Sequence, residues 1–149
     1  MKKVTRRTMM GLIVCGTVLA LLPGATGKDK PKHQSKAPIM AIAPDGTTWI
    51  AGEAKFSVVG STLEVSIDLA SGVPSAKVWL YPATDPWVIT TQPEFHLILT
   101  DGRGDLNYTE SYGINTLEPF DVWLGISVEG AAVHFSTDKS NPVTVDPKG

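Results

Sequence analysis

Apolar and polar residues alternate with a period of two along most of the chain after residue 38. In the range 63–69, Leu, Val, Ile and Leu occupy every second position and are separated by Glu64, Ser66 and Asp68. The range 120–128 repeats this pattern around Trp123 and Gly125. Successive side chains of a β-strand point to opposite faces of a sheet. The alternation therefore predicts strands that bury one face and expose the other.

Shorter runs of the same kind lie between turn-forming residues. They cover 39–43, 47–51, 76–81, 87–91, 95–100, 131–136 and 143–145, and Pro44-Asp45-Gly46 joins the first two. After residue 38, no stretch of ten or more residues has a helical apolar face. We therefore expect an all-β protein, an antiparallel, Ig-like β-sandwich of about seven to nine short strands. We assign it to one domain, residues 38–149.

The first 27 residues have the organisation of a secretory signal peptide. Basic residues at positions 2, 3, 6 and 7 precede an apolar run at 9–22, which ends at Pro23. Small residues at Ala25 and Gly27 then mark a cleavage site before Lys28. The apolar run is shorter than the roughly 20 residues of a membrane-spanning helix. We predict export to the periplasm, the cell surface or the medium, with no membrane span left after cleavage; an uncleaved anchor is the alternative.

The export route has two interpretations. Arg6-Arg7 followed by Thr8 and two methionines resembles a twin-arginine signal. The strongly apolar run that follows favours the general secretory route instead. Cleavage at Gly27 would remove Cys15, the sole cysteine of the chain. The mature domain would then be held together by its core alone and would have no cysteine for a metal centre or for catalysis.

Charge is distributed unevenly along the chain. The signal peptide holds four of the 13 basic residues, so the mature chain carries nine basic and 15 acidic residues, a net charge of −6. Residues 28–36 alone contribute +3, which leaves −9 for the remainder. We interpret residues 28–37 as a disordered basic leader, because the stretch is polar and nearly free of apolar residues. The acidic body argues against nucleic acid and anionic membranes as partners.

Aromatic side chains occupy polar-face positions of two predicted strands. If Val78 and Leu80 point inward, then Trp79 and Tyr81 point outward, and Trp123 points outward from the range 120–128. Aromatic rings on a sheet face stack on sugar rings or on a partner protein. We therefore take Trp79, Tyr81 and Trp123 as candidate ligand-binding residues. The alternatives are that a loop or the N-terminal hairpin covers the tryptophans, or that Trp123 packs across Gly125.

Two histidines provide a different hypothesis. His96 and His134 are also predicted to point outward, and they could bind one metal ion if their strands were neighbours. A third ligand would come from Asp68 or Asp121. The chain has no Gly-x-Ser-x-Gly, His-Glu-x-x-His or phosphate-binding glycine motif. We therefore expect a non-catalytic protein without a cofactor; a metal-binding protein or hydrolase that uses the two histidines is the alternative.

Two segments resemble a known class of extracellular module. They are residues 72–80, Gly-Val-Pro-Ser-Ala-Lys-Val-Trp-Leu, and residues 100–104, Thr-Asp-Gly-Arg-Gly. This pattern is similar to that of bacterial Ig-like and carboxypeptidase-regulatory-like (prealbumin-like) domains. The resemblance implies a structural or adhesive module without catalytic residues. Together with the outward aromatic residues, it predicts a module of the cell envelope or extracellular space that recognises a polysaccharide or an envelope protein.

Overall fold

The computed structural model describes residues 34–84, 88–90 and 96–149. The predicted signal peptide and residues 28–33 of the predicted leader lie outside the described residues. Within these ranges the chain forms nine β-strands and no helix. The strands are β1 (Gln34–Ile42), β2 (Thr48–Val59), β3 (Thr62–Ala70), β4 (Lys77–Ala83), β5 (His96–Leu99), β6 (Asp105–Gly113), β7 (Phe120–Val128), β8 (His134–Ser136) and β9 (Val143–Val145).

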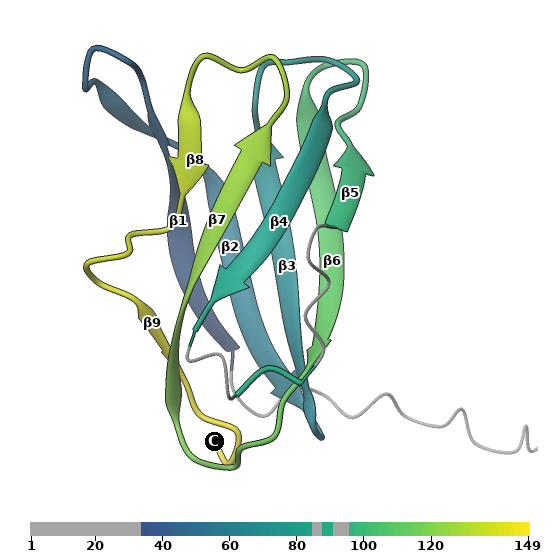
Figure 1. Ribbon diagram of the computed structural model, residues 1–149, viewed down its shortest axis with the longest axis vertical. Helices are drawn as coiled ribbons and strands as arrows, with labels where there is room; N and C mark the ends of the chain where they lie inside the picture. The colour runs from purple at the N-terminus through teal and green to yellow at the C-terminus, as the bar shows by residue number, and fades with distance from the viewer. Residues whose placement is uncertain (1–33, 85–87, 91–95) are drawn as a thin grey trace, which may run out of the picture.

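The strands form two facing layers that belong to one antiparallel sheet. Its order is β5-β4-β7-β8-β1-β2-β3-β6, and β9 pairs with β7. The sheet folds over between β8 and β1, so that β4, β5, β7, β8 and β9 lie in front of β1, β2, β3 and β6 (Figure 1). The predicted all-β, antiparallel fold is confirmed. The layers are continuous because β1 pairs with β2 along its whole length and with β8 at Met40–Ile42.

Alternating apolar residues from both layers fill the space between them. The inward positions of β3, β4 and β7 are buried, as the alternation predicts, and β2 adds the fully buried Phe56. Complete burial of one such aliphatic or aromatic side chain stabilises a fold by about 1.5–3 kcal/mol. The largest fully buried side chains are Tyr112, Phe56, Ile39, Leu63, Ile67, Leu69, Leu80, Leu124, Val65, Val78, Val122 and Val145.

Strand β6 was not predicted from the alternation. It pairs with β3 along nine residues, and Leu106, Tyr108, Glu110 and Tyr112 pair with the buried residues of β3. Glu110 interrupts the apolar series, so the pattern is obscured. The Tyr108 hydroxyl donates a hydrogen bond to Glu110 Oε2 at 2.8 Å. Burial, with a contribution from the Glu110 charge, raises the pKa of the Tyr112 phenol far above its usual range.

Several predicted boundaries need correction: the strand expected at 47–51 extends to Val59, and the one expected at 131–136 begins at His134. Strand β1 begins at Gln34, and Ala37 is buried in the core, so the last four residues of the predicted leader belong to the sheet. The predicted strand at 87–91 is reduced to one bridge between Ile89 and Ile114 among its described residues, 88–90. Positions 87 and 91 lie outside the described residues. Pairing with β2 explains the earlier start of β1, because it satisfies the backbone of residues that carry little apolar signal.

The two segments that resemble Ig-like modules meet at one corner of the fold. Thr100 is buried, and its hydroxyl accepts a hydrogen bond from Ala76 N at 2.8 Å and donates one to Val73 O at 2.7 Å. Gly104 has φ +87°, and a Cβ at this position would overlap the Gly72–Val73 backbone. The residues of the pattern therefore have a structural role in this protein, namely to join the loop between β3 and β4 to the loop between β5 and β6.

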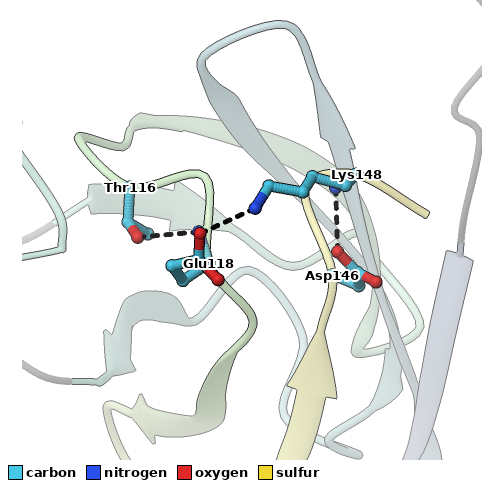
Figure 2. A network of polar contacts seen from close by, with 4 residues as sticks. All are labelled: Thr116, Glu118, Asp146 and Lys148. Carbon is cyan, nitrogen blue, oxygen red and sulfur yellow. Dashed lines mark hydrogen bonds and ion pairs between the residues drawn. The ribbon is translucent and has the colours of Figure 1, made fainter.

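A polar network holds the C-terminal segment against the loop between β6 and β7. Lys148 Nζ contacts Glu118 Oε1 at 2.6 Å, and the Lys148 amide donates a hydrogen bond to Asp146 Oδ1 (Figure 2). Thr116 Oγ1 accepts a hydrogen bond from the Glu118 amide at 3.0 Å. The network lies just after β9, a three-residue strand that pairs with β7 at Phe120–Val122.

Candidate binding face

The register of β4 and β7 places the three candidate aromatic residues on one outer surface. Tyr81 lies opposite Gly125, Trp79 lies opposite Ser127, and Trp123 lies opposite Ala83. Directly paired residues of antiparallel strands point to the same side of a sheet. Val78 and Leu80, which alternate with Trp79 and Tyr81 along β4, are fully buried. We call the surface formed by Trp79, Tyr81 and Trp123 the aromatic face.

Gly125 provides the space in which the Tyr81 ring lies. A Cβ built on Gly125 would overlap the Cε2 and Cδ2 atoms of this ring. Tyr81 is nevertheless 39% exposed, so one side of the ring faces the sheet and the other remains available. The alternative that Trp123 packs across Gly125 is therefore wrong, because Tyr81, the residue directly opposite on β4, occupies that position.

Trp123 carries a cation beside its ring. The ammonium group of Lys139 lies 5.3 Å from the ring centroid, which is within cation–π range. Thr137 fixes the start of the loop that bears this lysine. Its amide donates a hydrogen bond to Leu124 O at 2.9 Å, and its buried hydroxyl accepts one from Leu124 N at 2.8 Å. Trp79 and Trp123 are both half-buried, so each offers part of its surface.

Sequence reasoning missed a second group of exposed apolar residues. The hairpin between β1 and β2 extends beyond the rest of the sheet (Figure 1). It exposes 38% of Ile42, 44% of Trp49 and 68% of Ile50. The sequence contains one indication of this apolar group: Asp45 is the sole charged residue between positions 39 and 52. Lys139 was also missed, since its contact with Trp123 depends on how the loop between β8 and β9 lies against β7.

The structure does not bring the predicted metal ligands together. His96 lies in β5 and His134 in β8, and two further strands, β4 and β7, separate them in the sheet. Asp68 lies in β3 of the other layer, and Asp121 accepts a hydrogen bond from the Thr144 hydroxyl at 2.7 Å. The condition that the histidine strands be neighbours is not met. Within the described ranges, no three or more His, Cys, Asp or Glu side chains are placed to hold one metal ion.

An outward His96 implies, by alternation, that Ile98 points outward and Leu99 inward, and the structure reverses both of these directions. Leu99 was expected to point inward, but it is 61% exposed and pairs with the exposed Lys77. Ile98 pairs with the buried Val78. A continuous apolar run from 97 to 99 contains no alternation that would distinguish the two faces. The backbone of His96 pairs with Leu80, while its side chain lies outside the described residues.

Comparison with known proteins gives no relative for this chain. No family model, no curated protein and no solved structure matches it significantly. The resemblance to Ig-like and prealbumin-like modules therefore stays a prediction. In the part of the chain that the structure describes, there is no helix long and apolar enough to cross a membrane.

Proposed function

We propose that this chain is an exported, non-catalytic recognition module of the cell envelope or extracellular space. It binds a glycan or a partner protein through the aromatic face. The observation that supports this proposal is the placement of Trp79, Tyr81 and Trp123 on one outer surface of β4 and β7. Exposed rings of this kind provide large apolar contact areas that are rigid and retain a polar edge.

The polar setting of the rings also favours recognition over simple packing. Tyr81 rests on Gly125, so its ring is already oriented before any ligand arrives. Lys139 adds a hydrogen-bond donor beside Trp123. A binding surface with oriented rings loses little conformational entropy when a ligand binds. These features support a site for a flat, hydroxyl-bearing ligand such as a sugar ring.

Binding to cell-wall and polysaccharide fractions tests the proposal. The full chain would be expressed in a bacterial host, and the exported product would be compared with a Trp79→Ala, Trp123→Ala double variant. We expect the double variant to remain folded and to lose at least about ten-fold in affinity, because alanine removes the stacking surface. A Ser66→Ala, Asn107→Ala variant on the opposite layer is the matched control and should bind normally. Equal binding by all three proteins would contradict the proposal.

Export is tested separately on the same product. N-terminal sequencing of protein recovered outside the cytoplasm should give Lys28 as the first residue. A product that begins at Met1 and stays with the membrane would indicate an uncleaved anchor. Retention of the chain in the cytoplasm would contradict the proposed location.

A further inference from the structure

A groove adjoins the aromatic face on the side of β8 and β1. Its volume is about 850 Å³, and it runs between the β1 edge from Ser35 to Ile42 and the segment 136–144, which leads from the end of β8 into β9. Among the described strands, only β8 pairs with this edge of β1, and it does so at Met40–Ile42. The rest of the edge is left uncovered, which creates the groove. At the far end, the Ser35 hydroxyl donates a hydrogen bond to Thr144 O at 3.1 Å and bridges the two walls.

Two residues join the groove to the aromatic face. Lys139 lines the groove, and its ammonium group lies over the Trp123 ring. Ser136 also lines the groove and pairs with Gly125, over which the Tyr81 ring lies. A linear ligand that stacks on the rings therefore meets the groove without crossing an intervening strand.

The β1 wall disfavours a peptide that would bind as an added strand. Pro38 lies in the middle of the exposed part of this edge. Proline has no amide hydrogen, and it fits within a sheet where its nitrogen faces the free edge of a strand. An incoming peptide would lack a donor at that point and would meet the pyrrolidine ring. The groove is consequently poorly suited to backbone pairing, which is what recognition of an extended peptide uses.

The groove also offers little net charge to a ligand. Lys36 is paired with Glu53, with 3.3 Å between Lys36 Nζ and Glu53 Oε1. The other charged residues of the lining, Asp138 and Lys139, are adjacent in the chain and carry opposite charges. Apolar side chains such as Met40 alternate along the walls with uncharged polar groups such as the Asn141 amide. A concave, largely apolar lining with a few polar groups is typical of sites for uncharged small molecules and sugars.

We infer that the aromatic face and the groove form one extended site for a linear, uncharged polysaccharide. This inference rests on the proposed function and names its ligand class. Seven residue steps from Ser35 to Ile42 make the groove roughly 23 Å long, which has room for several sugar units. The rings hold the first units by stacking, and the groove adds contacts to the units that follow.

A length series of oligosaccharides tests this arrangement by titration calorimetry. The probes are β-1,4-glucose, β-1,4-N-acetylglucosamine and α-1,4-glucose oligomers of two to six units, with polygalacturonate as the charged comparator. For at least one series we expect the hexamer to bind the exported protein about ten-fold more tightly than the dimer. A Met40→Ala, Asn141→Ala variant should lose this gain and keep the affinity for the dimer.

The outcomes separate the inference from the proposed function. If the groove variant keeps the whole length gain while the Trp79→Ala, Trp123→Ala variant loses binding, the inference is wrong and the aromatic face remains the site. Stronger binding of polygalacturonate than of the neutral oligomers would overturn the ligand class. Failure of every oligomer to bind would overturn the inference, whereas binding to an envelope protein would leave the proposed function in place. Because Met40 is half-buried, its replacement by alanine also removes packing. Asn141→Ala alone is therefore the second variant, and it should lose part of the affinity gain with oligomer length.

Discussion

The two outer surfaces of the sheet are built on the same alternation and carry different chemistry. On the back layer, Glu53 Oε1 lies 3.3 Å from Lys36 Nζ and 3.5 Å from Lys55 Nζ. The hydroxyl oxygens of Ser66 and Thr109 are 2.9 Å apart. On the front layer, the equivalent outward positions hold the aromatic face. Around these residues the back surface is polar and solvated, while the front surface keeps apolar area in contact with water.

This difference separates the part of the pattern that folding requires from the part that it leaves unconstrained. Most inward residues of both layers are buried, because each layer must cover the other. Packing of the core therefore does not determine which residues occupy the outward positions. Rings at those positions cost solubility and add no core packing, which is the reason we propose a binding role for them.

Each layer contains a glycine within a strand, and the two glycines differ in what a side chain would meet. A Cβ at Gly52 on the back layer would overlap the main-chain carbonyl of Asp68. Since backbone cannot move aside easily, we expect Gly52→Ala to destabilise the protein by about 3 kcal/mol. Denaturant unfolding measures this change. Gly102→Ala is the control, because nothing lies within 4 Å of a Cβ there, and a large loss in that variant would contradict the interpretation.

On the front layer, the neighbour of the glycine is a side chain, so the effect should be smaller. Gly125→Ala would displace the Tyr81 ring and cost about 1–2 kcal/mol. In a double-mutant cycle, adding Tyr81→Ala should remove most of this cost, because the alanine Cβ then has space. Unfolding free energies of the four proteins measure the coupling. Additive effects of the two substitutions would show that the ring does not occupy that position.

The alternation predicted the layers well where one face is uniformly apolar. For β3, β4 and β7 it gave both the position of the strand and the direction of each side chain. It failed for β6, where Glu110 stands among apolar inward residues, and for β5, where the run 97–99 is apolar throughout. In both cases pairing with a neighbouring strand determines the structure, and that pairing leaves no local signal in the sequence.

The candidate site was predicted as a set of residues but not as an arrangement. Alternation placed Trp79, Tyr81 and Trp123 on outer positions, yet it could not specify the register between β4 and β7. That register sets Tyr81 over Gly125, and the loop after β8 sets Lys139 over Trp123. Contacts of this kind join residues about 16–44 positions apart in the chain, which local patterns do not encode.

The back surface should respond to acid in a way that the aromatic face does not. Lys36, with a further contribution from Lys55, holds the pKa of Glu53 below the usual glutamate value of 4.5. A carboxyl with a lowered pKa in the folded state stabilises the protein above its usual pKa, and this stabilisation is lost as the pH falls through the folded value. Glu53→Gln should therefore flatten the decline in unfolding free energy below about pH 4.5. Trp123→Ala is the comparison and should retain the wild-type pH dependence; a flattened profile in that variant would remove the distinction between the surfaces.

The smallest effect is expected outside both surfaces, at the C-terminal network. Lys148 and Glu118 are in contact at 2.6 Å, but their side chains are 57% and 76% exposed. Water screens such a pair, so Lys148→Ala should lower the unfolding free energy by at most about 0.5 kcal/mol. High salt should reduce this difference further. Because Figure 2 shows the pair next to the segment that carries β9, a loss several times larger would indicate that the network, rather than strand pairing, holds β9 against β7.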